Sequence, residues 1–314
     1  MKFNEVTDDF VIIDTRSPAE YEETHIPGAY NIPLFTNEER AIVGTIFKKE
    51  GNMNAIKEGI NIFSKKLPEM MKEYFKHRNK KILIYCWRGG MRSKVIVNFL
   101  ESIGFYAKQL DGGHKAYRKD VLNYFNNIKF KPKLIVLHGL TGSGKTEILK
   151  KIQPSIDLEG IAQHRSSLLG RIGLKPRSQK MFDALLYQKL KKLENEKFVF
   201  IEGESRKIGK VEMPLFLMKK IKNGINIKIE CNIDERTQRL VKEYFTKISK
   251  KDINYILEIL PKLKQKISNK VINELENSIN EKKYDNFTKS MLEHYYDPLY
   301  KHSLDKLNYK LITN

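Results

Sequence analysis

Short apolar runs alternate with longer amphipathic stretches along the first 125 residues. Because buried strands are short and apolar, three of these runs predict strands: Phe10–Asp14, Ile82–Tyr85 and Phe105–Leu110. Ser17, Pro18 and Glu20 predict a helix start, since serine caps a helix and proline suits its first position. Helical periodicity over Ala55–Tyr74, interrupted at Pro68, predicts a further helix. Strands that alternate with helices predict an α/β fold with a parallel sheet covered on both faces.

The alternation resumes beyond residues 119–132, which we interpret as a linker region. The apolar runs that follow predict three more strands: Leu134–His138, Phe198–Glu202 and Ile225–Cys231. Helices are expected at Glu147–Ile152 and from Asp234 onward. From Asp252 to the end, apolar residues recur at every fourth position among lysines, which predicts amphipathic helices. We therefore expect an α/β domain over residues 1–125, a second parallel α/β domain over 126–250, and a basic helical region over 251–314 that packs on the second domain.

The apolar run Ile82–Tyr85 leads directly into a loop that begins with Cys86. Gly89 and Gly90 let this loop fold back, because glycine tolerates backbone angles that other residues avoid. Arg88 and Arg92 place positive charge near the sulfur, just before a predicted helix at 94–102. A cysteine at a helix start between cations has a lowered pKa and is a competent nucleophile. We therefore predict that Cys86, assisted by Arg88 and Arg92, is catalytic rather than a buried structural cysteine, and that the loop binds an anion.

A phosphate-loop motif, G-x-x-x-x-G-K-T, follows the strand predicted at 134–138 and precedes a predicted helix, which is the context that the motif requires. Its predicted phosphate-binding residues are Gly139, Gly142, Ser143, Gly144, Lys145 and Thr146. The backbone N–H groups would hold a diphosphate at the positive end of the helix dipole. Lys145 would contact the outer phosphate. The Thr146 hydroxyl would contact a magnesium ion, which is the one metal that the sequence suggests.

Polar residues near the ends of later strands are candidates for substrate binding. They are Glu159, His164, Arg165, Glu202, Glu204, Arg206, Arg236 and Arg239. In an open parallel sheet, ligands bind at the carboxyl ends of the strands, where several of these residues are expected to lie. Either Glu202 or Glu204 could hold magnesium or act as a base. Arg236 and Arg239 share one helix face, and we expect them to contact phosphates. Cys231 is predicted to lie in the core.

Charge favours a polyanionic partner. The chain has 58 Lys and Arg against 38 Asp and Glu, a net charge of +20. Residues 131–314 hold 37 of the basic and 22 of the acidic residues. This excess, with aromatic residues between the late lysines, suits nucleic acid. Two cysteines cannot form a disulfide framework and suit a reducing compartment. No apolar run approaches the ~18 residues of a membrane span, and the N-terminus lacks a signal pattern, so we expect a cytoplasmic protein.

The N-terminal part resembles a rhodanese domain. The segments that carry this resemblance are DTRSPAEYEETHIPGAYNIP at 14–33, the Cys86 loop, and LDGGHKAYR at 110–118. Rhodaneses carry sulfur or selenium on the loop cysteine as a persulfide or perselenide. The resemblance implies that role for Cys86.

The whole chain resembles the tRNA 2-selenouridine synthase family. The resemblance rests on CWRGGMRS, HGLTGSGKT, DLEGIAQHRSS, FIEGESRKIG and ERTQRLVKEY. It implies an enzyme that geranylates the sulfur of wobble 2-thiouridine in the tRNA anticodon stem-loop, and then replaces the S-geranyl group with selenium. It assigns geranyl diphosphate to Gly139–Thr146, selenium from selenophosphate to Cys86, and tRNA to the basic C-terminal helices. No tightly bound cofactor is implied, and selenophosphate synthetase is an expected partner.

Three other functions fit the same residues. The first is an ATP-dependent tRNA sulfurtransferase with a nucleotide at the phosphate loop and a persulfide on Cys86. The second is a non-enzymatic sensor in which oxidation of Cys86 controls nucleotide binding. The third is a phosphate-loop kinase fused to an inert rhodanese domain. Whether the loop holds geranyl diphosphate or a nucleotide stays open at this point, because a phosphate loop recognises only the phosphates.

Overall fold

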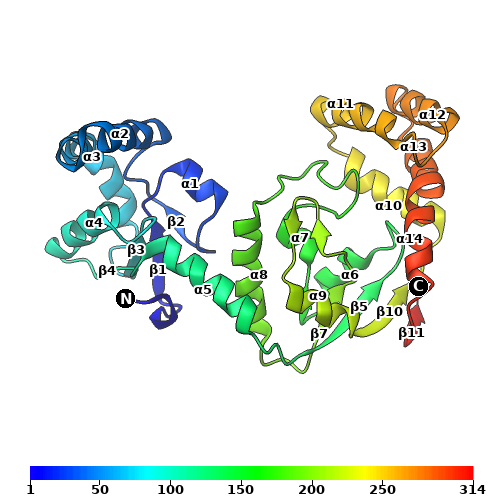
Figure 1. Cartoon of the computed structure of the whole chain (residues 1–314), viewed down its shortest axis with the longest axis horizontal. Helices are drawn as coiled ribbons and strands as arrows, with labels where there is room; N and C mark the ends of the chain where they lie inside the picture. Colours follow the sequence, from blue (N-terminus) through cyan, green and yellow to red (C-terminus); the bar gives the residue numbers. More distant parts are fainter. Residues whose placement is uncertain (314) are drawn as a thin grey trace. The chain divides into compact units, whose positions relative to one another are not determined.

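A computed structural model describes residues 1–313 of the chain. Contacts divide the chain into two units, each with its own parallel sheet. The first comprises Met1–Ile128 with Asp183–Gln188, and the second Lys129–Phe182 with Lys189–Asn314. Figure 1 shows helices against the sheet in each unit and a group of helices toward the C-terminus. The prediction of an α/β fold with parallel sheets is confirmed.

The sheet of the first unit has four parallel strands in the order β2-β1-β3-β4. These strands are β1 (Phe10–Asp14), β2 (Tyr30–Asn31), β3 (Lys81–Tyr85) and β4 (Ala107–Gln109). Ile13, Ile82 and Ile84 are fully buried and pack with Ile96 and Leu100 of a neighbouring helix. β3 is a central strand, so the residue that follows it lies at the carboxyl edge of the sheet.

Five α-helices and one short 3₁₀ turn accompany this sheet. They are η1 (Phe3–Glu5), α1 (Pro18–Glu23), α2 (Asn37–Glu50), α3 (Asn52–Phe75), α4 (Met91–Ser102) and α5 (Gly113–Asn127). Helix α1 begins where predicted, with Ser17 as its N-cap. Helix α2 was not predicted, although Thr36 and Glu39 form a capping box at its start, which is a sequence signal for a helix.

Two predictions for this unit were wrong. Helix α3 runs through Pro68 without interruption. Proline removes one helical hydrogen bond, but Phe63 before it and Met70 and Tyr74 after it pack in the same core, which keeps both halves in line. The supposed linker from residue 119 is helical as far as Asn127, since α5 is held by buried side chains at successive turns.

The sheet of the second unit has five parallel strands in the order β11-β10-β5-β7-β6. They are β5 (Lys133–His138), β6 (Ser155–Ile156), β7 (Phe198–Glu202), β10 (Ile225–Ile229) and β11 (Leu311–Thr313). A separate antiparallel pair is formed by β8 (Lys207–Ile208) and β9 (Val211–Glu212). Strand β11 corrects the expectation that the chain is helical from Asp252 to its end.

Helices flank this sheet and form the C-terminal region (Figure 1). The first group is α6 (Lys145–Lys151), α7 (Leu158–Ala162), α8 (Gln179–Leu193), α9 (Leu215–Lys222) and α10 (Ile233–Phe245). The C-terminal group is α11 (Lys250–Ile259), η2 (Leu260–Leu263), α12 (Asn269–Asn280), α13 (Tyr284–Met291), the π-helix η3 (Leu292–Tyr296) and α14 (Asp297–Leu304). Leu240, Tyr244 and Phe245 of α10 share one hydrophobic core with buried residues of this group.

Candidate functional site

Cys86 follows β3 directly and lies at the base of the loop that leads into α4. Its Sγ accepts hydrogen bonds from the Gly90 N–H and from the Ser93 hydroxyl, both at 3.2 Å. The side chain is only 3 % exposed. Cys86 is therefore buried, but its neighbours are polar donors that suit a sulfur anion rather than an apolar core.

The start of α5 closes over this loop. Gly113 has a φ of +57°, and a Cβ built on it would lie 2.2 Å from the Cys86 carbonyl oxygen. That carbonyl accepts a hydrogen bond from the His114 N–H at 2.9 Å. From β4, the Gln109 side chain donates to the Gly89 carbonyl oxygen at 2.8 Å. The loop is thus fixed by backbone contacts that only a glycine at position 113 permits.

The two predicted arginines differ in their surroundings. Arg92 lies in the first turn of α4 and pairs with Glu20 of α1 at 2.9 Å. Arg88, in the same loop, is exposed. Arg92 thus has an acidic partner within the unit, whereas the Arg88 side chain is open to solvent.

The phosphate loop follows β5 and precedes α6, as predicted. Gly142 has a φ of +80°, and a Cβ there would lie 3.0 Å from Leu240 of α10. Lys145 Nζ donates to the carbonyl oxygens of Gly139 and Leu140 at 2.9 and 3.4 Å. Cationic Nζ therefore sits over the loop where an anion would be held.

Three predicted carboxylates lie near Lys145 and Thr146. The Thr146 hydroxyl donates to Glu159 Oε2 at 3.3 Å, and the Glu159 N–H donates to Glu202 Oε1 at 2.8 Å. Burial and the charge of Glu204 raise the pKa of Glu159 to about 8. Burial also raises the pKa of Glu202 and of Glu204. Glu202 Oε2 is buried without a hydrogen-bond partner among residues 1–313. The group formed by Glu159, Glu202 and Glu204 therefore has one oxygen that no protein donor contacts.

Two further candidates, His164 and Arg165, are held by neighbouring structure. The His164 ring packs against Gly170 and Gly209, where added Cβ atoms would come within 2.7 and 2.6 Å of the ring. Burial, together with the charge of Arg165, lowers the pKa of His164. Arg165 pairs with Glu243 at 2.5 Å. Both side chains are therefore held in place by contacts with other residues of the second unit.

The remaining predicted arginines separate into three environments. Arg206 is exposed and pairs with Glu212 at 2.9 Å. Arg236 is 3 % exposed, pairs with Asp297 at the start of α14, and donates to the Thr141 carbonyl oxygen at 2.8 Å. Arg239 donates to the Gly142 carbonyl oxygen and pairs with Glu147 at 3.2 Å. Arg236 and Arg239 thus both reach the phosphate loop, but through its carbonyl groups.

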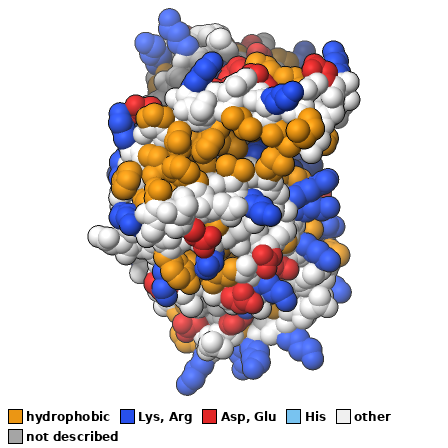
Figure 2. Space-filling view, turned by 90° about the vertical axis from the view of Figure 1, so that its left-hand side faces the viewer, with side chains coloured by type: hydrophobic (Ala, Val, Ile, Leu, Met, Phe, Trp, Pro, Cys, Tyr) orange, Lys and Arg blue, Asp and Glu red, His pale blue; other side chains and the backbone are white. Residues whose placement is uncertain are grey.

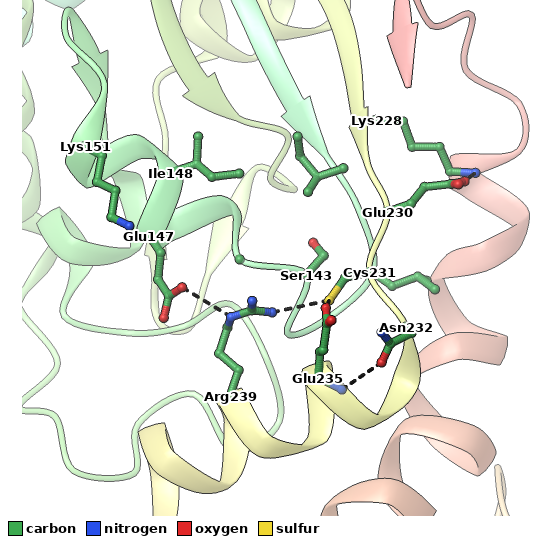
Figure 3. A pocket seen from close by; sticks show the side chains of 13 residues that line it. Ser143, Glu147, Ile148, Lys151, Lys228, Glu230, Cys231, Asn232, Glu235 and Arg239 are labelled. Atoms are coloured by element: carbon green, nitrogen blue, oxygen red, sulfur yellow. Dashed lines mark hydrogen bonds and ion pairs between the residues drawn. The ribbon is translucent and has the colours of Figure 1, made fainter. Parts of the chain in front are cut away.

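A cavity of about 660 Å³ lies beside the phosphate loop, against α6 and α10 (Figure 3). The Cys231 thiol lines it, 3.1 Å from Glu235 and 3.6 Å from Arg239. The prediction that Cys231 lies in the core was wrong, because β10 ends at Ile229 and Cys231 directly precedes Asn232, the N-cap of α10. Ser143 Oγ also borders the cavity and is buried with no hydrogen-bond partner among the described residues.

Sequence reasoning missed Ser93, Gln109 and Cys231. A helix was predicted over 94–102, but the hydrogen bond from Ser93 to the Cys86 sulfur depends on α4 beginning earlier, at Met91. Gln109 belongs to a strand that is distant in sequence, so no local signal points to it. The Asn232 cap was the signal that could have moved Cys231 out of the strand.

The fold and the two sites define a protein that joins a rhodanese-like domain to a phosphate-loop domain. A family model described as a rhodanese-like domain matches residues 4–120, and one described as a tRNA 2-selenouridine synthase AAA domain matches residues 132–314. The chain is similar to proteins named tRNA 2-selenouridine synthase from two bacteria. The relative from Shewanella halifaxensis (strain HAW-EB4) is 30% identical, with 95% of this chain and 90% of the relative covered. The relative from Sulfurovum sp. (strain NBC37-1) is 32% identical, with 94% and 89% covered.

The chain belongs to the tRNA 2-selenouridine synthase family, which confirms the resemblance seen in its sequence. Within residues 1–313, no helix combines the length and the apolar character that a membrane crossing needs.

Proposed function

We propose that this protein converts wobble 2-thiouridine in tRNA to 2-selenouridine through an S-geranyl intermediate, using geranyl diphosphate and selenophosphate. The observation that supports this most is the pairing, on one chain of this family, of a cysteine loop rich in donors with a complete phosphate loop. Two unlike transfers need two sites of unlike chemistry. The basic charge of residues 131–314 suits the tRNA anticodon stem-loop.

In the first step, the sulfur of the base attacks C1 of geranyl diphosphate. The C1–O bond breaks, the diphosphate leaves, and the base loses its N3 proton. A leaving diphosphate is stabilised by preorganised positive charge and N–H donors. Residues Gly139–Thr146, with Lys145 and Arg239, would supply both. Lys145 and Arg239 now donate to loop carbonyls, and the diphosphate oxygens would replace those acceptors.

The residues around Thr146 fit a magnesium ion. Mg²⁺ prefers oxygen ligands and usually keeps waters or substrate phosphates in its shell. The Thr146 hydroxyl, Glu159 and the unpartnered Glu202 Oε2 offer such oxygens. Among residues 1–313 no group of three His, Cys, Asp or Glu side chains could hold a metal by itself. The ion would therefore rely on one or two protein oxygens, and it would add positive charge to the leaving diphosphate.

In the second step, selenium replaces sulfur at C2 of the base near Cys86. The C2–Se bond forms, the C2–S bond breaks, geranyl thiol leaves, and water releases the phosphorus of selenophosphate as phosphate. This exchange needs no oxidant. The exposed Arg88 and the N–H groups of the loop suit the selenophosphate anion. A selenophosphate synthetase is the expected partner that supplies it.

An ATP-dependent tRNA sulfurtransferase is the second candidate. It is favoured by the position of Glu202, which ends β7 in register with Leu137 of β5 and so lies beside the phosphate loop. A carboxylate at the end of a strand next to the loop holds magnesium in many nucleotide hydrolases. In that case Cys86 would carry a persulfide.

Nucleoside mass spectrometry separates the two functions. The purified protein is incubated with thiolated tRNA, geranyl diphosphate and selenophosphate, beside Cys86→Ala and Lys145→Ala. We expect the wild type to form 2-selenouridine, Cys86→Ala to stop at the S-geranyl base, and Lys145→Ala to fail before it. An unchanged base together with ATP consumption would reject the proposal and favour the sulfurtransferase.

A further inference from the structure

An apolar groove lies between α2, α3 and the start of α4 in the first unit. Its volume is about 840 Å³. Phe47, Ile60 and Met91 line it and are each more than half exposed, at 57, 58 and 53 %. Figure 2 shows hydrophobic side chains gathered in a band across this face, with both basic and acidic side chains around it. Large apolar patches on a folded surface mark binding sites.

Small residues leave this groove open. Ala41 and Gly44 on α2 face the space, and Ala55 and Gly59 on α3 border it from the other helix. A Cβ built on Gly44 would meet no atom within 4 Å. The two helices therefore pack without filling the volume between them, and the walls consist of larger apolar side chains.

The groove borders the start of α4, the helix that follows the Cys86 loop. Met91, Arg92 and Val95 line it, and all three belong to the first turns of α4. The N-cap of this helix is Gly90, whose N–H donates to Cys86 Sγ. A ligand that reacts next to Cys86 can thus extend an attached chain along α4 into the groove.

The charged residues that line the groove indicate that the ligand's attached chain is joined to an anionic group. Arg40, Lys48 and Arg92 line it, and no acidic residue does. Arg40 and Arg92 converge on Glu20, which does not line the groove, at 3.9 and 2.9 Å. An apolar chain joined to a phosphodiester backbone satisfies both the apolar walls and the cations.

We propose that this groove binds the isoprenoid chain of an S-prenylated wobble base, and so holds the tRNA intermediate for selenium transfer at Cys86. The inference rests on the proposed function, because the S-geranyl group is the intermediate of that reaction. The chain leaves water for an apolar surface, and the tRNA phosphates meet the cations. Release of geranyl thiol from C2 then frees the groove.

The test uses synthetic anticodon stem-loops whose wobble 2-thiouridine carries an S-methyl, S-dimethylallyl or S-geranyl group. Binding is measured by fluorescence anisotropy, and selenium incorporation by mass spectrometry with selenophosphate. A fully buried methylene changes affinity about fourfold, so partial burial predicts at least about a tenfold gain from S-methyl to S-geranyl. Equal affinities across the series would overturn the proposal.

Two groove variants and one control locate the effect. Gly44→Leu fills the open volume and suits a helix, and Ile60→Ser makes an exposed wall polar. Both should lose the chain-length preference and keep their affinity for the S-methyl stem-loop. Ser64→Leu adds the same leucine at an exposed position of α3 outside the groove and should behave as wild type. A preference that survives in both groove variants would overturn the proposal.

The outcomes also separate this inference from the proposed function. Selenium incorporation without chain-length preference would leave the function intact and reject the groove. A chain-length preference in binding that Gly44→Leu abolishes, without any incorporation of selenium, would support the groove and reject the function. If Gly44→Leu slows only the formation of the S-geranyl base from geranyl diphosphate, the occupant is the free donor and the proposal is wrong.

Discussion

Replacing Gly113 with alanine tests whether close contact between α5 and the Cys86 loop fixes the shape of that loop. The new Cβ would lie 2.2 Å from the Cys86 carbonyl oxygen and 2.4 Å from the Gly89 nitrogen. Both are backbone atoms, so no side chain can turn aside. Either the start of α5 or the loop has to move. The hydrogen bond from the His114 N–H to the Cys86 carbonyl crosses the same gap and would be stretched.

The expected loss of stability has two parts. Alanine in the left-handed region costs about 1–2 kcal/mol. Overpacking against neighbouring atoms adds about 1–3 kcal/mol. Gly113→Ala should therefore lower the free energy of unfolding by about 2–5 kcal/mol. Gly28→Ala is the matched control, because Gly28 also has a positive φ, +85°, but open space around its Cβ position. In Gly28→Ala, only the cost of the left-handed backbone conformation applies.

The single tryptophan of the chain makes the assay specific to this unit. Trp87 directly follows Cys86 and stacks on His114 with ring centroids 5.6 Å apart. Urea unfolding followed by Trp87 fluorescence therefore reports on the rhodanese-like domain, and alkylation of Cys86 followed by mass spectrometry reports on the loop. We expect faster alkylation in Gly113→Ala than in Gly28→Ala. Equal losses of stability in the two variants would refute the reasoning.

Three further predictions concern the phosphate-loop domain. Arg236→Gln should lower the free energy of unfolding of this domain by up to about 3–5 kcal/mol, because it leaves Asp297 without its buried partner. Arg206→Gln, at an exposed ion pair, should lower it by under about 1 kcal/mol. Equal losses of stability in the two variants, followed by circular dichroism, would contradict this. Burial raises the pKa of Glu159 to about 8 from 4.5. The folded chain therefore keeps this proton up to about pH 8, whereas the unfolded chain releases it near pH 4.5. The stability that the proton provides is complete below pH 4.5 and is lost as the pH rises to about 8. The free energy of unfolding, measured by urea titration in the presence of EDTA, should therefore fall across that window by up to about 1.4 kcal/mol per pH unit. Glu159→Gln should flatten this slope, and exposed Glu196→Gln should not. Binding of tRNA should weaken at least about tenfold between 50 and 200 mM salt, and salt-independent filter binding would argue against phosphate contacts.

Local patterns predicted the elements that place both sites. The apolar runs of β1 and β7 coincide with the observed strands, because a strand buried on both faces needs consecutive apolar residues. The phosphate loop was predictable for the same reason, since its motif requires a strand before it and a helix after it. Cys86 was proposed as a catalytic residue from its neighbours in sequence, and the hydrogen bond that its sulfur accepts from the Gly90 N–H belongs to the same loop.

Contacts distant in sequence were not predictable. The buried position of Cys86 depends on Gly113 and Gln109, which only the folded chain brings to it. Pro68 was expected to interrupt a helix, but tertiary packing on both sides outweighed the lost hydrogen bond. Arg236 was expected to contact phosphate, and nothing near it in sequence indicated that Asp297 would pair with it.

Strand β11 has a consequence for how the protein is made. It pairs with β10 in parallel, and the Glu230 N–H donates to the Thr313 carbonyl oxygen at 2.8 Å. On a ribosome, β11 emerges after every other strand of its sheet, so β10 keeps one unpaired edge throughout synthesis. Unpaired edges invite pairing with other chains. Nascent chains that stall before residue 311 should therefore be the species most prone to aggregate and most dependent on chaperones.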